Sequence, residues 1–265
     1  MKKIIYILAL VLLAGVVSCK TQYDMILEGN DVPAKYKMAM ELFEKEKYTK
    51  AASMFESMKI GVRGTSLEDT VQFYTAYSYY MWGDVYSAEQ GFNSFVESFP
   101  RSPFTLRARF LYVDCLYEQT YRYELDQTPT YKALDAIYEF IRDYPEDPNS
   151  ANCRAMSEDL EERLDRKAYE AGKLYYTIED YKAATYALKL VIKEDADNIY
   201  REDIMYYVVM SSYKYALNSV SEKQRERYMA FTDEYFTFIT EFPESKYRDE
   251  LDNLSRRVNK ILERK

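Results

Sequence analysis

Apolar and aromatic side chains recur every three or four positions along nearly the whole chain from residue 33 onward, and glycine, proline or clustered charges interrupt the pattern. This spacing places side chains on one face of an α-helix, whereas a half-buried strand requires strict alternation. The sequence therefore predicts eleven helices joined by short turns, so that sequence neighbours run antiparallel. The expected ranges are 33–46, 48–60, 66–82, 84–99, 102–124, 128–144, 149–177, 180–193, 200–219, 221–241 and 244–263.

Five of these helices share one frame of side chains. A small residue is followed by large apolar residues at +4 and +7, and three of the five units have proline at +12. The small residue allows the preceding helix to approach closely, the large residues complete the same face, and proline ends the helix. The small positions are Ala51, Ala88, Ala133 and Ala184, with Phe231 in the fifth unit. Twelve residues before the small position, three units have a second small residue: Ala39, Ala76 and Gly172. The prolines are Pro100, Pro145 and Pro243.

This frame resembles the tetratricopeptide repeat, a helix–turn–helix unit that stacks into a solenoid. The predicted fold class is all-α: an α-solenoid of about five irregular helix pairs, closed by a C-terminal capping helix at 244–263. Phe231 stands at a small position, so the fifth pair is expected to sit further apart or to slide. An irregular helical bundle is the alternative.

Three junctions between predicted helices look alike, each with an aromatic residue, proline, and a Ser or Asp two residues later. Short side chains with an oxygen atom accept hydrogen bonds from the unpaired amides at a helix start. Ser102, Asp147 and Ser245 are therefore predicted as N-caps.

Composition narrows the possible functions. Seven glycines and seven prolines in 265 residues are too few for the turns of a sheet-rich fold. The sequence has no histidine, which excludes imidazole acid–base catalysis and histidine-ligated metals. A net charge of −8 argues against nucleic acid as a partner. The densest acidic segment, 158–162, alternates with basic residues at helical spacing and indicates surface ion pairs. No catalytic or metal-ligating residues are predicted; a carboxylate-based hydrolase on a helical scaffold is the enzymatic alternative.

The N-terminus predicts export. A basic start is followed by an apolar run over 4–17, which is shorter than the roughly 20 residues of a membrane-spanning helix. Residues 1–18 are therefore expected to be a signal peptide. Val16-Val17-Ser18-Cys19 resembles the lipobox of bacterial lipoproteins, which implies a covalent lipid on Cys19 and no other cofactor. Lys20 follows, where aspartate would resemble an inner-membrane retention signal, so attachment to the outer membrane is expected. A secreted protein cut after Ser18 is the alternative.

Residues 19–32 are expected to be the lipidated cysteine and a tether to the folded part. The two remaining cysteines, Cys115 and Cys153, are expected to be small buried residues, although a disulfide between them stays open.

The lipobox, the five repeats and the aromatic–proline junctions together resemble the BamD family of the β-barrel assembly machinery. The stretch AYEAGKLYYTIEDYKAATYALKLV at 168–191 is similar to that family's fourth repeat, and TPTYKALDAIYEFIRDYP at 128–145 to its third. The resemblance implies a lipoprotein on the periplasmic face of the outer membrane. It also implies two partners: unfolded outer-membrane β-barrel clients, bound by an N-terminal half at 33–148, and the POTRA region of BamA, docked by a C-terminal half at 149–265.

The resemblance also suggests which residues serve each role. Tetratricopeptide repeats bind extended segments with the first helix of each pair, on the face away from the small residue. Tyrosine suits such a surface, because its ring offers a large apolar area and has few rotatable bonds to be fixed on binding. The alternative for any one of these side chains is packing between adjacent repeats. The expected client groove comprises Tyr36, Met40, Phe43, Phe73, Tyr77, Tyr80, Arg109 and Tyr112.

The expected BamA-docking surface is the loop after the fourth repeat and the next helix start, with Arg201, Glu202 and Asp203. Exposed charges at this position are also what any solvated helix start would show. A general periplasmic tetratricopeptide adaptor for another envelope complex has the same anchor and groove, and only its partner would differ.

Overall fold

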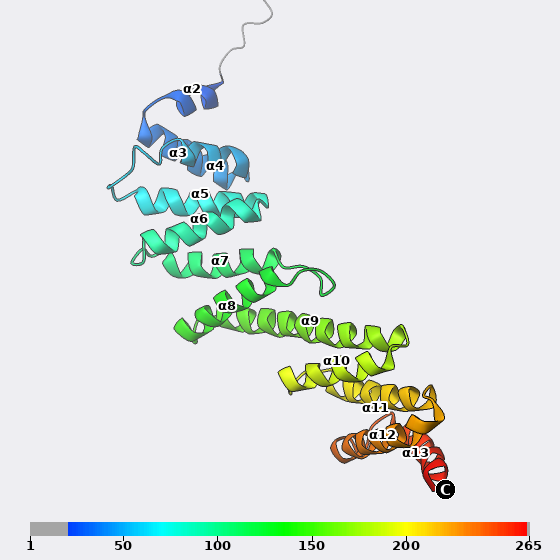
Figure 1. Cartoon of the computed structure of the whole chain (residues 1–265). Helices are drawn as coiled ribbons and strands as arrows, with labels where there is room; N and C mark the ends of the chain where they lie inside the picture. The colour runs from blue at the N-terminus through cyan, green and yellow to red at the C-terminus, as the bar shows by residue number, and fades with distance from the viewer. Residues whose placement is uncertain (1–20, 264–265) are drawn as a thin grey trace, which may run out of the picture. The chain divides into compact units, whose positions relative to one another are not determined.

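The computed structural model describes residues 21–263, and every regular element in that range is an α-helix (Figure 1). The prediction of an all-α chain is confirmed, and most helix bounds agree with the expected ones within three residues. The helices are α2 (Gln22–Glu28), α3 (Val32–Glu44), α4 (Tyr48–Glu56), α5 (Glu68–Trp82), α6 (Val85–Ser98), α7 (Thr105–Glu118), α8 (Thr128–Asp143), α9 (Asn149–Thr177), α10 (Tyr181–Glu194), α11 (Arg201–Leu217), α12 (Ser221–Glu241) and α13 (Arg248–Glu263).

The chain forms two compact units. Unit 1 contains the described residues up to Thr120 together with Asp135–Cys153, and unit 2 contains Tyr121–Leu134 together with the residues from Arg154 onward. In unit 1 each helix from α3 to α6 packs on the next helix in sequence, and in unit 2 the same holds from α10 to α12. Packing between sequence neighbours is the arrangement of an α-solenoid, which confirms the predicted architecture.

The small residues of the repeat frame lie where helices approach most closely. Ala51, Ala88, Ala133 and Ala184 are fully buried. In unit 2 a Cβ atom built on Gly172 of α9 would lie 2.7 Å from Leu188 Cδ2 of α10, so only glycine fits the observed separation. The frame thus marks the contact between the two helices of a repeat, as the sequence predicts.

The turn inside a repeat has the same backbone form in three places. The amides of Lys47, Asp84 and Asp180 each donate to the carbonyl five residues earlier, at 2.8–3.0 Å. The residue before each of them is left-handed, with φ of 57° at Glu46, 89° at Gly83 and 65° at Glu179. This is the Schellman closure of a helix C-terminus, and its recurrence makes each helix pair turn back in the same way.

The aromatic–proline junctions differ in detail from the prediction. Ser102, Asp147 and Ser245 do accept a backbone amide, at 2.8–3.3 Å, but from the residue two positions later. Helices α7 and α13 begin three residues after the predicted cap, and α9 begins two residues after it. Each side chain therefore closes a tight turn that precedes the helix. Helices α7 and α13 consequently start three and four residues later than expected, whereas α9 starts at the expected residue.

The expected tether contains a helix. Thr21 and Asp24 form a capping box at the start of α2, in which the Thr21 hydroxyl accepts from the Asp24 amide at 3.3 Å and the Thr21 amide donates to Asp24 Oδ2 at 3.0 Å. Tyr23, Ile26 and Leu27 pack against the apolar core of the first repeat. Residues 22–28 are therefore part of the folded body.

Phe231 is fully buried in the fifth repeat, and its ring contacts Tyr213 of α11 edge-to-face with centroids 5.5 Å apart. Helix α13 covers this repeat with Leu251, Leu254 and Val258, which confirms the predicted capping helix. Both Cys115 and Cys153 are buried thiols, and burial together with nearby carboxylates raises the pKa of Cys115 to about 12. None of the described helices is long and apolar enough to cross a membrane.

Tyrosine–carboxylate hydrogen bonds join alternate helices in both units. In unit 1 the Tyr80 hydroxyl of α5 donates to Asp114 of α7 at 2.6 Å. In unit 2 the Tyr206 hydroxyl of α11 donates to Glu250 of α13 at 3.0 Å, and Tyr247 of α13 donates to Asp203 of α11. In unit 1 this bond joins the first helices of two successive repeats, and in unit 2 the bonds join the first helix of the fifth repeat to the capping helix α13.

Candidate functional site

A cluster of aromatic rings in unit 1 lies on the first helices of two repeats, α3 and α5, and on Tyr48 at the start of α4. Phe43 of α3 contacts Tyr48, Tyr74 and Tyr77, with each pair of ring centroids 5.3 Å apart. Tyr77 also stacks on Tyr80 one turn further along α5, with centroids 6.2 Å apart. We call Phe43, Tyr48, Tyr74, Tyr77 and Tyr80, together with Arg107, the aromatic site. Its five rings are all half-buried, so each combines internal packing with an accessible edge.

Arg107 of α7 supplies a positive charge to this cluster. Its guanidinium carbon lies 4.5 Å from the Tyr77 ring centroid, and its Nη2 donates to the Tyr77 hydroxyl at 2.7 Å. The cation–π contact and the hydrogen bond hold the side chain in place, while the residue as a whole stays exposed. The site thus presents apolar ring edges next to a positioned guanidinium.

Tyr80 fixes the other end of the ring cluster. Its hydroxyl donates to Asp114, which lies on α7 seven residues after Arg107. Seven residues are two helical turns, so α7 presents Arg107 and Asp114 on one face. Burial, and then the bond to Asp114, raise the pKa of Tyr80 far above its usual range. Tyr80 therefore remains a neutral donor at any physiological pH.

The structure brings only part of the expected client groove together. Phe43, Tyr77 and Tyr80 belong to the aromatic site. Tyr36 and Met40 are half-buried against the core of the first repeat, and Tyr112 is half-buried against that of the second. Phe73 is only 1% exposed and stacks on Phe104 with centroids 4.6 Å apart, so its inclusion in an accessible groove is wrong.

Arg109 does not reach the rings. Its Nη1 lies 3.5 Å from Asp143 Oδ2, and its guanidinium carbon lies 5.7 Å from the Tyr144 ring centroid at the end of α8. Arg107, and not Arg109 as expected, is the arginine that lies beside the rings. The sequence feature that could have indicated this is Phe104, which stacks on Phe73 and lies three residues before Arg107, on the same helical face.

Two of the three expected docking residues in unit 2 make internal contacts. Arg201 pairs with Glu241 of α12 and donates from Nη1 to the Ala196 carbonyl at 3.1 Å. Asp203 accepts from Tyr247 and pairs with Lys246 at 3.1 Å. Glu202 lies between them in the first turn of α11 and is half-exposed.

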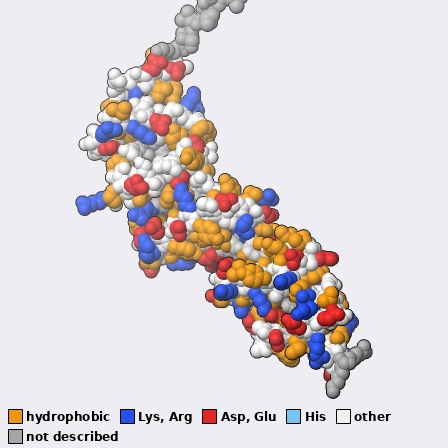
Figure 2. Space-filling view, viewed as in Figure 1, with side chains coloured by type: hydrophobic (Ala, Val, Ile, Leu, Met, Phe, Trp, Pro, Cys, Tyr) orange, Lys and Arg blue, Asp and Glu red, His pale blue; other side chains and the backbone are white. Residues whose placement is uncertain are grey.

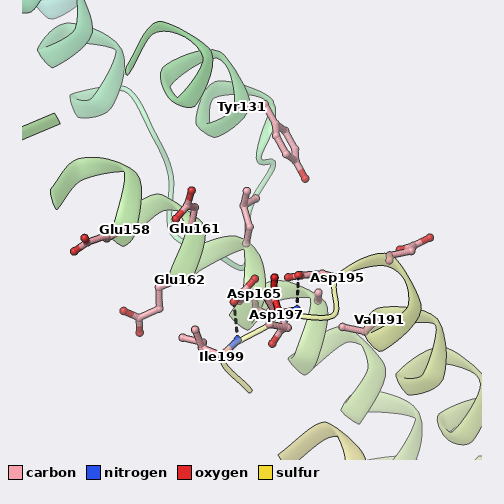
Figure 3. A pocket seen from close by; sticks show the side chains of 13 residues that line it. Tyr131, Glu158, Glu161, Glu162, Asp165, Val191, Asp195, Asp197 and Ile199 are labelled. Carbon is pink, nitrogen blue, oxygen red and sulfur yellow. Dashed lines mark hydrogen bonds between the residues drawn. The ribbon is translucent and has the colours of Figure 1, made fainter. Parts of the chain in front are cut away.

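The loop before α11 lines an acidic pocket in unit 2, shown in Figure 3. The cavity measures about 700 Å³ and has no lysine or arginine among its lining residues. Aliphatic carbons of Leu164, Val191 and Ile199 line it beside the carboxylates. Its seven acidic residues are Glu158, Glu161, Glu162, Asp165, Glu194, Asp195 and Asp197.

Asp165 is the most constrained carboxylate of this pocket. Its Oδ2 accepts the Ile199 amide at 2.9 Å, which holds the loop against α9. Burial raises the pKa of Asp165, the hydrogen bond from Ile199 opposes that rise, and the neighbouring Asp195 adds to it. Carboxylates that lie close together beside apolar side chains favour the binding of a positively charged group.

Cys19 and the signal peptide lie outside the described residues. Among the residues that are described, no group of acidic or sulfur-bearing side chains is arranged to hold a metal ion. Figure 2 shows hydrophobic side chains interspersed with charges of both signs on the visible surface.

Comparison with known proteins gives three similarities. Residues 30–227 match a family model described as "Outer membrane lipoprotein" (YfiO). The chain is 20% identical over 220 residues to an outer membrane protein assembly factor BamD of Caulobacter vibrioides, covering 82% of this chain and 72% of that protein. The crystal structure of a thermophilic TPR protein of Thermus thermophilus matches with a TM-score of 0.33 at 14% identity, over 87% of this chain and 98% of that one.

The family match begins within two residues of α3 and continues into α12, so it includes every helix of the aromatic site and every residue of the acidic pocket. The chain belongs to the YfiO family of outer membrane lipoproteins, the BamD type.

Proposed function

We propose that this protein is a non-catalytic binding subunit of outer membrane protein assembly, anchored to the periplasmic face of the membrane by a lipid on Cys19. Its unit 1 receives extended segments of unfolded β-barrel clients, and its unit 2 docks on the POTRA region of a BamA-like barrel protein. Family membership supports the role in outer membrane protein assembly. The observation that carries the client-binding step is the row of rings from Phe43 to Tyr80 with Arg107 beside it.

The chemistry of the aromatic site fits the end of a β-strand. A strand destined for a membrane barrel alternates apolar and polar side chains, and its apolar side chains can lie against the ring edges of Phe43 and Tyr77. Tyrosine rings lose little rotamer entropy on contact because they have only two side-chain torsions. The Arg107 guanidinium can pair with a terminal carboxylate in two parallel hydrogen bonds, although its Nη2 first has to release the Tyr77 hydroxyl.

Calorimetric titration with two synthetic peptides tests this step. Both have the alternating pattern and end in phenylalanine, one as the free carboxylate and the other as the amide. Arg107→Gln should weaken binding of the carboxylate peptide about tenfold, the worth of one charge-assisted hydrogen bond, and leave the amide peptide unchanged. Tyr77→Ala should weaken both peptides, because the ring contacts do not depend on the peptide's charge.

Arg109→Gln is the matched control, since it removes the same charge from the same helix two residues away. Equal losses for Arg107→Gln and Arg109→Gln would show that only net charge matters, and would refute the assigned role of Arg107. Binding that survives Tyr77→Ala would refute the aromatic site as the place of client contact.

The docking step is assigned to the acidic pocket and the start of α11. Arg201 and Asp203 shape this face through their internal ion pairs, and Glu202 and the pocket carboxylates give it negative charge. The proposal therefore requires a basic contact on the POTRA side, with an aliphatic group that enters beside Val191 and Ile199. Such charge pairing speeds association and selects the partner.

A gentle detergent pull-down of the tagged full-length protein tests this step. We expect the parent protein to recover a protein that has POTRA domains and a barrel. Reversing the exposed charges with Glu194→Lys and Asp197→Lys should abolish that recovery. Glu244→Lys, at an exposed position elsewhere in unit 2, is the control. Recovery of cell-wall or transport proteins without a barrel protein would refute the proposal and favour a general periplasmic adaptor.

A further inference from the structure

Helix α2 precedes the five helix pairs of the repeat pattern, and it lies directly after the expected lipid site. Only Lys20 separates Cys19 from Thr21, the N-cap of α2. Two residues span about 7 Å at most, whereas a fully extended tether over 20–32 would span roughly 45 Å. The presence of α2 therefore changes how far the first repeat can move from a lipid on Cys19.

Several contacts fasten α2 to the first repeat. Ile26 and Leu27 pack against its apolar core, and the Tyr23 hydroxyl donates to the Lys50 carbonyl of α4 at 3.4 Å. The Lys50 ammonium lies 5.2 Å from the centroid of the Tyr23 ring, which adds a cation–π contact. The capping box at Thr21 prevents the first turn from fraying at the end nearest the lipid.

The same end of unit 1 exposes two large apolar side chains. Met25 on the outer face of α2 is 57% exposed, and Ile60 in the loop after α4 is 84% exposed. The loop that carries Ile60 is held at the start of α3: a Cβ on Gly61 would lie 2.8 Å from Val32 Cγ2, and Lys35 Nζ donates to the Ser57 carbonyl at 3.4 Å.

We propose that α2 is a clamp that holds the first repeat on the bilayer surface, with Met25 and Ile60 in contact with lipid. This inference rests on the lipid anchor of the proposed function. A lipid within about 7 Å of a packed helix leaves the first repeat no room to leave the interface. Apolar side chains at that depth enter the boundary between headgroups and acyl chains. Lys59 and Arg63 lie close to Ile60 in the sequence, and their positive charges can pair with the phosphates of the lipid headgroups.

The clamp would also determine where clients are received. Phe43 of the aromatic site lies on α3, about 17 Å by helical rise from its first residue Val32. With α2 fixed at the interface, extended segments bound at Phe43 stay close to the membrane that they are to enter. A fully extended tether over 20–32 would allow the same site to move roughly 40 Å farther away.

Depth-dependent fluorescence quenching tests the clamp. The full-length lipidated protein is labelled with an environment-sensitive dye at Met25→Cys or Ile60→Cys and reconstituted in vesicles of phosphatidylethanolamine and phosphatidylglycerol that contain a nitroxide lipid. Cys115 and Cys153 are buried and the proposed lipid occupies the Cys19 thiol, so the label is specific. Tyr138→Cys, at an exposed position of α8 in the same unit, is the control. Most of the emission should be lost at positions 25 and 60 and little at 138.

A second variant separates the clamp from the anchor. Replacing Tyr23, Ile26 and Leu27 by serine removes the packing of α2 and should restore emission at position 60 while the protein stays in the vesicles. Equal quenching at 60 and 138, or quenching that the serine variant leaves unchanged, would overturn the clamp. The intact mass of the purified protein reports the lipid itself, so a missing lipid would refute the anchor of the proposed function instead.

Discussion

Gly172, in the C-terminal part of α9, allows a sharp test of how the two helices of a repeat are held together. Replacing glycine by alanine inside a helix normally stabilises by about 1 kcal/mol, because alanine loses less backbone entropy on folding. Here the new methyl group would lie 2.7 Å from Leu188 Cδ2, 3.2 Å from Leu188 Cγ and 3.5 Å from its Cα. Leu188 is fully buried, so it cannot swing into solvent to make room.

The two effects have opposite signs, and their magnitudes decide the outcome. Overpacking a tight core typically costs about 1–3 kcal/mol, which exceeds the propensity gain. Gly172→Ala should therefore destabilise the protein by about 1 kcal/mol, or roughly 2–4 °C in melting temperature for a chain of this size. The neighbouring Ala171 is exposed, and Ala171→Gly isolates the propensity effect at about 1 kcal/mol.

Urea unfolding followed by far-UV circular dichroism measures these differences, and a double-mutant cycle assigns their cause. Leu188→Ala alone creates a cavity and costs about 2–5 kcal/mol. In its presence Gly172→Ala should become neutral or stabilising, which gives a coupling energy of about 1–2 kcal/mol. A stabilising Gly172→Ala in the parent protein, or a coupling near zero, would refute the claim that close approach at this position requires glycine.

Three further outcomes are expected. Asp165→Asn should stabilise the protein near pH 7, because the raised pKa of Asp165 makes its charged form costly in the folded state. The difference in the free energy of unfolding between variant and parent should vanish below about pH 4, where the unfolded carboxyl is also protonated. Urea unfolding at both pH values measures this difference. Tyr80→Phe should lower the free energy of unfolding by about 1–2 kcal/mol, because it removes the hydrogen bond to Asp114, and Asp114→Asn should lower it less. Thermal unfolding measures both changes. Cys115 should resist alkylation at pH 8 until urea unfolds unit 1, because its pKa of about 12 leaves almost no thiolate; rapid labelling of the native protein would contradict its burial.

The repeat architecture could be predicted because its determinants are local and periodic. Ala51, Ala88 and Ala184 each stand at a fixed offset from large apolar residues, so a single spacing rule locates the helix contacts. Their complete burial confirms that rule. The helix bounds followed equally well from the three-to-four spacing.

The parts that were missed depend on information outside that spacing. Helix α2 is short and lies outside the repeat frame, and it persists because Tyr23 and Ile26 find a partner surface on a repeat that begins later in the chain. The spacing also did not separate Arg107 from Arg109 on α7: Arg107 lies against the Tyr77 ring, whereas Arg109 pairs with Asp143 near the end of α8. Local propensity does not determine either outcome, since tertiary contacts decide both.

The tyrosine–carboxylate bonds between alternate helices, together with the bond from Tyr235 of α12 to Asp252 of the neighbouring α13, have a consequence for the range of pH that the protein tolerates. The raised pKa of Tyr80 and Tyr206 means that these donors lose their protons only above pH 10, and the lowered pKa of Asp252, bonded to Tyr235, means that this acceptor gains one only below about pH 4. With no histidine in the sequence, none of these contacts uses an imidazole, the side chain whose charge ordinarily changes near neutral pH. A solenoid joined by these bonds keeps the same polar contacts when the pH of its surroundings moves away from neutrality in either direction.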